Sequence, residues 1–167
     1  VETPTVPGSG DEVDINVKVE EKPSGALLAG LGYSQSDGIV INASVTQDNF
    51  AGTGKRVSLA LQTSSANQAY QVAYTNPYYT VDGISRGFNM SYRSTDFDDL
   101  NTADYKTDDA IIGVDYGIPL SETNRFRFGL DLHHINFETG AQPSQEVLDF
   151  ESTEGNSFLN FETTLRW

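Results

Sequence analysis

The sequence contains no cysteine, a single tryptophan and a single methionine among its 167 residues. Without cysteine there are no disulfide bonds, so the stability of the protein must have another source. No stretch approaches the roughly eighteen apolar residues that a membrane-spanning helix needs, because the longest aliphatic runs are of the kind Ile39-Val40-Ile41. Nothing in the sequence therefore predicts a transmembrane helix.

Basic residues are also scarce, since 10 Lys and Arg stand against 24 Asp and Glu, for a formal net charge of −14. This balance argues against nucleic acid as a partner, because nucleic-acid-binding proteins carry basic patches. The acidic residues crowd two stretches, which hold Asp96, Asp98, Asp99, Asp104, Asp108 and Asp109 in one and Glu138, Glu146, Asp149, Glu151 and Glu154 in the other. We interpret both as solvated loops rather than cation sites, because the first does not fit an EF-hand.

Alternation of apolar and polar residues is what the sequence has in place of long apolar runs. From Gly25 to Trp167 there are about eight segments of roughly ten residues, each apolar at every second position. This length and period are typical of membrane-spanning β-strands, in which only half the residues need be apolar. The sequence therefore predicts an all-β protein, with an antiparallel transmembrane β-barrel domain over residues 25–167.

The alternation also predicts which residues share a face of the barrel wall. The residues expected to face lipid are Leu59, Val72, Phe88, Val114, Phe128 and Phe161. Those expected to face the lumen are Gln62, Gln71, Asn89, Asp115, Arg127 and Glu162.

The connections between segments predict an orientation. Two short hairpins at 34–37 and 64–67 and two long acidic loops at 94–106 and 136–156 fall on one side, and connections 48–54, 76–83 and 119–124 fall on the other. In outer-membrane barrels the long loops face outward and the shorter turns face the periplasm. We therefore expect the acidic loops to be extracellular.

Residues 1–24 differ from the rest of the chain. Val13, Ile15, Val17 and Val19 alternate with polar residues, which predicts one more half-buried strand. A strand with one apolar face needs a partner, and the first 24 residues offer none. This segment is therefore expected to be the remnant of a truncated domain.

Enzymatic readings find little support, and we predict neither catalysis, nor a cofactor, nor a metal. His133 and His134 are neighbours on one predicted strand, so their side chains point to opposite faces. A set of charged residues on three successive strands could form a catalytic or conducting cluster in the lumen, although ordinary pairing of opposite charges across strands is the favoured interpretation. This lumenal charge cluster consists of Asp115, Arg127, Asp131, Glu162 and Arg166.

Three motifs, taken in their order and spacing, carry a resemblance to a known family. They are Asp48-Asn49-Phe50-Ala51-Gly52-Thr53-Gly54, Thr75-Asn76-Pro77-Tyr78-Tyr79-Thr80-Val81-Asp82-Gly83, and Val6-Pro7-Gly8 followed by Val13-Asp14-Ile15 and Val19-Glu20-Glu21. Together they resemble the BamA family, the central subunits of the bacterial outer-membrane protein assembly machine. The resemblance assigns residues 1–24 to the end of the last periplasmic POTRA domain and residues 25–167 to about the first eight strands of a roughly sixteen-stranded barrel.

The resemblance implies a function and a set of partners. Proteins of this family fold and insert other barrel proteins into the outer membrane of Gram-negative bacteria, with the first barrel strand as a lateral gate to which client strands pair. The implied partners are client outer-membrane proteins, lipoprotein subunits of the machine, and the lipid and lipopolysaccharide of the membrane, and the N-terminal residues would be periplasmic. The implied pairing edge consists of Ser24, Gly25, Ala26, Leu27, Leu28, Ala29, Gly30, Leu31, Gly32 and Tyr33.

Two alternatives stay open from the sequence. Gly30 and Gly32 either weaken a seam that must open or relieve crowding where the wall bends. The whole chain could also be a free-standing small barrel of eight strands, with a structural or adhesive role and acidic loops as its contact surface.

Overall fold

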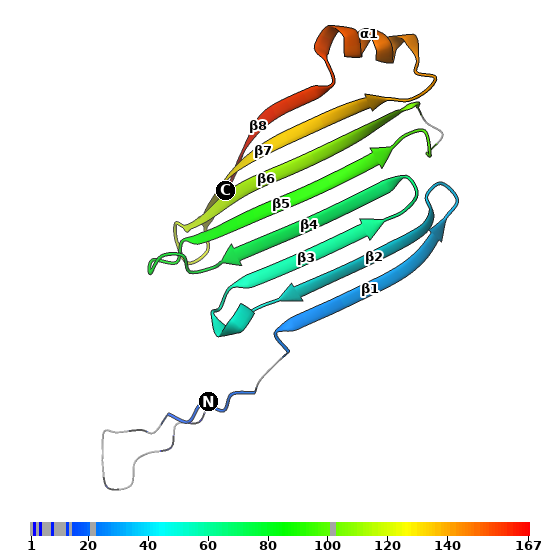
Figure 1. The fold of residues 1–167 in the computed structure, drawn as a ribbon. Helices are drawn as coiled ribbons and strands as arrows, with labels where there is room; N and C mark the ends of the chain where they lie inside the picture. Colours follow the sequence, from blue (N-terminus) through cyan, green and yellow to red (C-terminus); the bar gives the residue numbers. More distant parts are fainter. Residues whose placement is uncertain are drawn as a thin grey trace.

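The computed structural model describes residues 2, 4, 8, 13, 15–20, 23–100 and 103–167. Its centre is one antiparallel sheet of eight strands that follow one another in sequence order (Figure 1). The strands are β1 (Gly25–Ser34), β2 (Gly38–Gln47), β3 (Arg56–Thr63), β4 (Asn67–Asn76), β5 (Ser85–Asp96), β6 (Tyr105–Pro119), β7 (Arg125–Thr139) and β8 (Ser157–Arg166). The predicted all-β fold with eight antiparallel strands is confirmed.

The register of the sheet aligns apolar residues on a single face, which we call the apolar face. One row of directly paired positions crosses all eight strands without a polar residue; it consists of Leu27, Val45, Leu59, Val72, Met90, Ile112, Leu132 and Phe161. All six residues predicted to face lipid lie on this face, because side chains two positions apart on a strand point the same way. The predicted strand phase is therefore correct.

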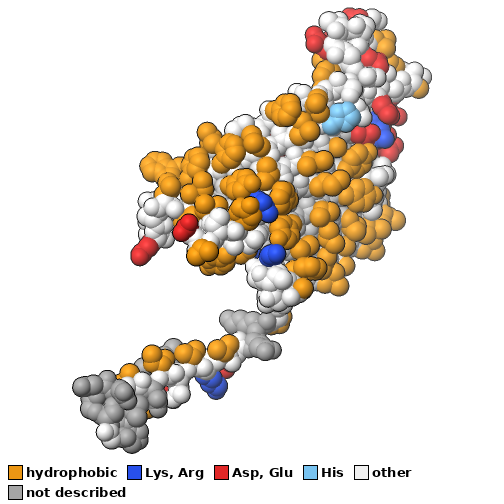
Figure 2. Space-filling view, turned by 60° about the vertical axis from the view of Figure 1, so that its left-hand side comes forward, with side chains coloured by type: hydrophobic (Ala, Val, Ile, Leu, Met, Phe, Trp, Pro, Cys, Tyr) orange, Lys and Arg blue, Asp and Glu red, His pale blue; other side chains and the backbone are white. Residues whose placement is uncertain are grey.

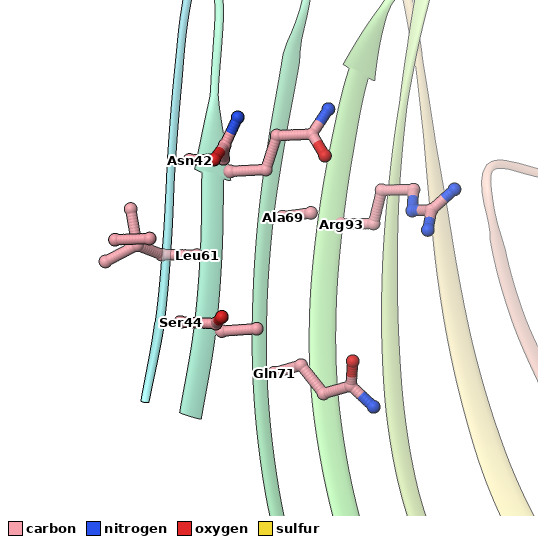
Figure 3. A pocket seen from close by; sticks show the side chains of 9 residues that line it. Asn42, Ser44, Leu61, Ala69, Gln71 and Arg93 are labelled. Atoms are coloured by element: carbon pink, nitrogen blue, oxygen red, sulfur yellow. The ribbon is translucent and has the colours of Figure 1, made fainter. Parts of the chain in front are cut away.

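The opposite face, which we call the polar face, carries small and polar side chains. The neighbouring row of paired positions consists of Ala26, Thr46, Ser58, Ala73, Asn89, Gly113, Asp131 and Glu162. Figure 3 shows the two faces side by side, since Leu61 points away from the side to which Gln71 and Arg93 project. The residues predicted to face the lumen lie together on the polar face.

The sheet is a single open layer. Among the described residues, β1 pairs only with β2 and β8 only with β7, so the two outer strands do not close the sheet (Figure 1). The sequence left a free-standing, closed barrel of eight strands as an alternative. The structure does not adopt that arrangement. Among the described residues, no helix is both long and apolar enough to cross a membrane.

Hardly any side chain is buried in this layer. Ala66, with 2% of its surface exposed, is the only buried hydrophobic residue in the described part of the chain, whereas Phe161 is 83% exposed. Hydrophobic side chains spread over the sheet in Figure 2, and the acidic ones in view gather mainly at the end where α1 lies. A contiguous apolar surface of this extent requires a covering that water cannot supply.

The segment 136–156 was expected to be one long loop, and this expectation is wrong. β7 continues to Thr139, and a helix, α1 (Gln145–Glu154), fills most of the remainder. Ser144 in extended conformation precedes the helix, and Gly155 with φ of 84° ends it. Phe150 anchors the helix, because its ring lies 6.0 Å from that of Phe137 and 5.9 Å from that of Phe158.

The connection between β2 and β3 contains a single turn of 3-10 helix, η1 (Phe50–Gly52). Asn49 and Ala51 adopt positive φ angles of 57° and 51°, which non-glycine residues rarely do. The side chain of Asn49 stabilises the turn, because its Oδ1 accepts a hydrogen bond of 2.6 Å from the backbone of Gly54. Arg56 forms an ion pair with Asp48 across the same turn.

The N-terminal segment is described only in part. Residues 15–20 lie outside any strand, and an isolated bridge joins Glu2 and Asn16 through backbone hydrogen bonds of 3.0 and 2.9 Å. Val17 and Val19 are exposed. The strand expected over Val13 to Val19 is therefore not formed at residues 15–19, the rest of that segment lies largely outside the described residues, and the assignment of 1–24 to a POTRA domain stays a prediction.

Candidate functional site

The first candidate site is the outer edge of β1. All ten residues of this strand pair with β2, from Gly25 opposite Gln47 to Ser34 opposite Gly38. In the described part of the chain no strand pairs with the other edge of β1. Leu27 is 77% exposed and Leu28 is 68% exposed, so neither face of the strand is covered. The predicted pairing residues thus lie on one continuous, accessible strand edge.

The backbone groups of β1 divide between its two edges. The backbone N–H of Asp48 donates to the carbonyl of Ser24 at 2.6 Å, so these two residues form a hydrogen-bonded pair. Such pairs alternate with non-bonded pairs along an antiparallel ladder. The backbone groups of Ala26, Leu28 and Gly30 therefore bond to β2. Those of Leu27, Ala29 and Leu31 point to the free edge.

The two central glycines of β1 have different surroundings. A Cβ atom at Gly30 would lie 2.6 Å from Oδ1 of Asn42, whose carboxamide lies across the glycine. A Cβ atom at Gly32 would meet nothing within 4 Å. Gly30 therefore makes room for a neighbour on the polar face, whereas packing does not require glycine at position 32.

A hollow on the polar face lies inward of β1, on the strands that follow it in the sheet. It has a volume of about 270 Å³ and is lined by β2 to β5, with Asn42, Gln71 and Arg93 among the lining residues (Figure 3). Asn42 faces Gly30 of β1 and also contributes to the hollow. The Asn42 carboxamide therefore lies between β1 and this hollow.

The second candidate site is the lumenal charge cluster, and the structure brings its members together. Asp115, Arg127, Asp131 and Arg166 line a hollow of about 340 Å³ on the polar face of β5 to β8. Glu162 lies beside them, directly opposite Asp131. The prediction that these five residues share one face is therefore correct.

The expected pairing of opposite charges within this cluster is wrong. Arg127 lies opposite Arg166, and Asp131 lies opposite Glu162, so like charges face one another across β7 and β8. Like charges in directly opposed positions are destabilising unless other groups compensate them. Asp131 accepts a hydrogen bond of 3.2 Å from Nδ2 of Asn89, but among the described residues no ion pair joins either arginine to a carboxylate.

Glycines on the neighbouring strands give the carboxylates their positions. A Cβ atom at Gly87 would lie 2.1 Å from Oδ1 of Asp115, and one at Gly113 would lie 1.9 Å from Oδ1 of Asp131. The two carboxylates therefore lie flat against the sheet, in space that any other residue would fill. The sequence contains these glycines, but only the register of the strands reveals which carboxylate each one faces.

His133 contacts the lumenal charge cluster through Glu162, a contact that the sequence did not predict. Its Nε2 lies 3.3 Å from Oε2 of Glu162, and its Nδ1 lies 3.9 Å from Oδ1 of Asp109. His134 points to the opposite face, as predicted, and its Nε2 lies 3.1 Å from the hydroxyl of Ser157. No group of three or more His, Asp or Glu side chains in the described residues is arranged to hold a metal ion.

The end of the sheet that carries the short hairpins is tied together by one carboxylate. Asp37 accepts hydrogen bonds of 2.9 Å from the hydroxyl of Ser36 and 2.8 Å from Nδ2 of Asn67. These donors, Ser36 first, hold the pKa of Asp37 below its ordinary value. The β1–β2 hairpin and the β3–β4 hairpin are thus linked outside the strands.

Comparisons with known proteins give the following matches. Residues 49–167 match the family model described as the Omp85 superfamily domain. The chain is 32% identical to the outer membrane protein assembly factor BamA of Neisseria meningitidis over 90% of its own length and 19% of the relative's. It is 35% identical to the protein of the same name from Nitratidesulfovibrio vulgaris, over 60% of its own length and 13% of the relative's.

A solved structure matches almost the whole chain. It is the crystal structure of BamA from Haemophilus ducreyi lacking POTRA domains 1–3, with a TM-score of 0.62 and 25% sequence identity. The match covers 99% of this chain and 32% of that one. The chain therefore spans less than a third of the length of each of these relatives.

Proposed function

The chain belongs to the Omp85 superfamily, and from this premise we propose that it acts in an outer-membrane protein assembly factor that folds and inserts other barrel proteins. Two proteins named outer membrane protein assembly factor BamA match the chain in sequence, and a crystal structure of BamA matches it in fold. The apolar face of the sheet supports a membrane location, because each of its eight strands presents an apolar side chain to that face at mid-sheet. The membrane is the outer membrane of a Gram-negative bacterium.

The free edge of β1 carries the functional proposal. An incoming client strand adds to this edge as a further strand of the sheet, and β1 acts as the lateral gate. The backbone groups of Leu27, Ala29 and Leu31 supply the hydrogen bonds. Each such bond contributes about 0.5–1.5 kcal/mol net, so around five bonds give a few kcal/mol. This free energy is enough to hold a client and small enough to release it.

The partners follow from the same proposal. The clients are outer-membrane proteins with unpaired strand edges, and the other partners are lipoprotein subunits of the assembly machine together with the lipid and lipopolysaccharide around the barrel. The end of the sheet with α1 faces the exterior, and residues 1–24 lie in the periplasm. This orientation rests on the acidic, longer connections at the α1 end.

Single-cysteine crosslinking tests the proposal in the full-length protein. The absence of native cysteine makes each introduced thiol unique. Ala26→Cys or Leu28→Cys should crosslink to a cysteine in the terminal strand of a client caught during assembly. Val72→Cys, in the central strand β4, is the matched control and should give no crosslink. Equal crosslinking from β1 and β4 would rule out templating by the β1 edge.

A further inference from the structure

The apolar face carries no charged residue over its middle, and the charged residues nearest the middle are Asp108 toward the α1 end and Arg86 toward the opposite end. On β6 the face runs from Tyr116 through Val114, Ile112 and Ala110 to Asp108. No Asp, Glu, Lys or Arg lies between these limits on the apolar face of any strand. The eight steps from Asp108 to Tyr116, at about 3.3 Å each, span roughly 26 Å along the strand, close to the height of a membrane band once tilted.

Arg86 lies at the boundary of this uncharged band on the side opposite α1. It begins the apolar face of β5, directly opposite Tyr116 of β6 and two residues before Phe88. Among the strand residues that the structure describes, it is the only Lys or Arg of the apolar face at the end opposite α1. The other strand arginines near that end lie on the polar face; they are Arg56, Arg125, Arg127 and Arg166.

Aromatic rings hold the Arg86 side chain in place. Its guanidinium carbon lies 3.8 Å from the ring centre of Tyr79 and 5.0 Å from that of Phe88. The Tyr79 ring in turn meets Tyr116 edge-on at 6.5 Å. Cation–π contacts of this kind stabilise and orient a guanidinium group. The cation is therefore fixed against the edge of the apolar band.

The charge of Arg86 is not neutralised by the described residues. No carboxylate in the described part of the chain forms an ion pair with it, and its Nε is buried without a hydrogen-bond partner. A guanidinium group has five N–H donors in a planar fork that matches the oxygens of a phosphate. At the boundary of a membrane band, the phosphate within reach is that of a lipid headgroup.

We propose that Arg86, held by Tyr79 and Phe88, binds the phosphate of a phospholipid in the leaflet at the end of the barrel opposite α1. This site rests on the proposed membrane location, but it does not involve the β1 edge, from which three strands separate it. Its role is to fix the height of the wall relative to the headgroups on that side. The tyrosine rings at the same level favour the interface for the same reason.

Native mass spectrometry of the full-length protein tests the site. The protein is reconstituted into vesicles of phosphatidylethanolamine and phosphatidylglycerol, extracted in mild detergent, and the phospholipids that remain bound are counted. Arg86→Gln should lower the retained phospholipid about fivefold, the effect expected for one basic residue at a membrane surface. Arg86→Lys should give an intermediate loss, because lysine lacks the planar fork. Arg125→Gln, on the polar face, is the matched control and should retain the wild-type amount.

A second variant and a competition experiment test the site and the identity of its ligand separately. Tyr79→Leu removes the stacking ring and leaves the charge, so it should also lower retention even if Arg86→Gln fails to fold. Inorganic phosphate added to the wild-type sample should leave the bound phospholipid in place. Equal retention by the wild type and the Arg86 and Tyr79 variants would overturn the site, and ready displacement by inorganic phosphate would overturn its lipid as the ligand.

The same preparations separate this inference from the proposed function. Each variant is assayed for insertion into vesicles and for folding of an added client barrel, and Arg86→Gln should retain client folding. A wild-type protein that inserts but folds no client would overturn the proposed function alone. A folded, inserted Arg86→Gln variant with undiminished phospholipid would overturn the lipid site alone.

Discussion

At the scale of single residues, the polar face depends on glycines that lie opposite carboxylates and carboxamides. Gly30 faces Asn42, Gly87 faces Asp115, and Gly113 faces both Asn89 and Asp131. The side chains lie flat in these spaces, so the wall stays thin where it carries charge. Composition alone shows 15 glycines, but it does not show that several are spacers for acidic groups.

Gly113→Ala should destabilise the sheet. The new Cβ atom would lie 1.9 Å from Oδ1 of Asp131 and 2.1 Å from Oδ1 of Asn89, so both side chains must move and their 3.2 Å hydrogen bond is lost. We expect a loss of about 1–2 kcal/mol in the free energy of unfolding, measured by urea titration in detergent or vesicles. Gly32→Ala is the control, because nothing lies within 4 Å of that site, and it should be neutral or slightly stabilising.

The carboxyl group of Asp37 should titrate below its ordinary value in an NMR titration. Its donors, Ser36 and Asn67, stabilise the charged form and lower its pKa. A lowered pKa in the folded state means that its contribution to stability is complete above the ordinary value of 3.8 and is lost as the pH falls through the lower, folded-state value. Asn67→Ala should move the pKa back toward 3.8, and an unchanged pKa in that variant would contradict the hairpin link.

At the scale of elements, the alternating pattern predicts the strands but not all of their limits. β6 begins at Tyr105 and β7 ends at Thr139, beyond the expected apolar segments, because paired backbone continues where side chains turn polar. α1 was missed because its sequence has only a weak apolar stripe, and tertiary contacts of Phe150 fix it. The like-charge pairs of β7 and β8 depend on register across a 17-residue connection, which no local pattern specifies.

Because alternate residues of β1 direct their backbone groups to opposite edges, proline substitutions test strand addition more directly than side-chain substitutions do. Ala29→Pro should remove an N–H from the free edge while leaving the β1–β2 ladder intact, since proline is tolerated on that side of an edge strand. Client folding should fall several-fold with the free energy of unfolding within about 1 kcal/mol of wild type. Leu28→Pro should instead lose a bond to β2 and lower stability as well. Full client folding activity in the Ala29→Pro variant would contradict strand templating.

At the scale of the whole molecule, the alternating pattern predicts the fold because the fold is a single sheet with one apolar face. The resemblance to the BamA family, read from three motifs, is confirmed by the family match and by the relatives of that name. Those relatives are named as assembly factors, which agrees with the prediction that the chain is not an enzyme. The sequence could not show whether the sheet closes, because closure depends on strand partners rather than on the alternating pattern.

Replacement of Ile112 by arginine should be costly, because this residue lies midway along the apolar face of β6, between Asp108 and Tyr116. A charge there would face the middle of the bilayer, and we expect a loss of about 2–4 kcal/mol in the free energy of unfolding from vesicles. Gln71→Arg, on the polar face of β4, is the control and should cost much less. A larger loss at Gln71 than at Ile112 would mean that the faces are reversed.

In the strand addition proposed above, the hydrogen bonds at the outer edge of β1 would come from peptide groups, which are common to every protein. Such an edge would distinguish an extended chain from a folded one, but backbone hydrogen bonds would not distinguish one amino-acid sequence from another. Clients that pair in this way would be free to diverge in evolution without any compensating change in Leu27, Ala29 or Leu31. Under this proposal, selection of the right clients would occur elsewhere, before a strand reaches β1.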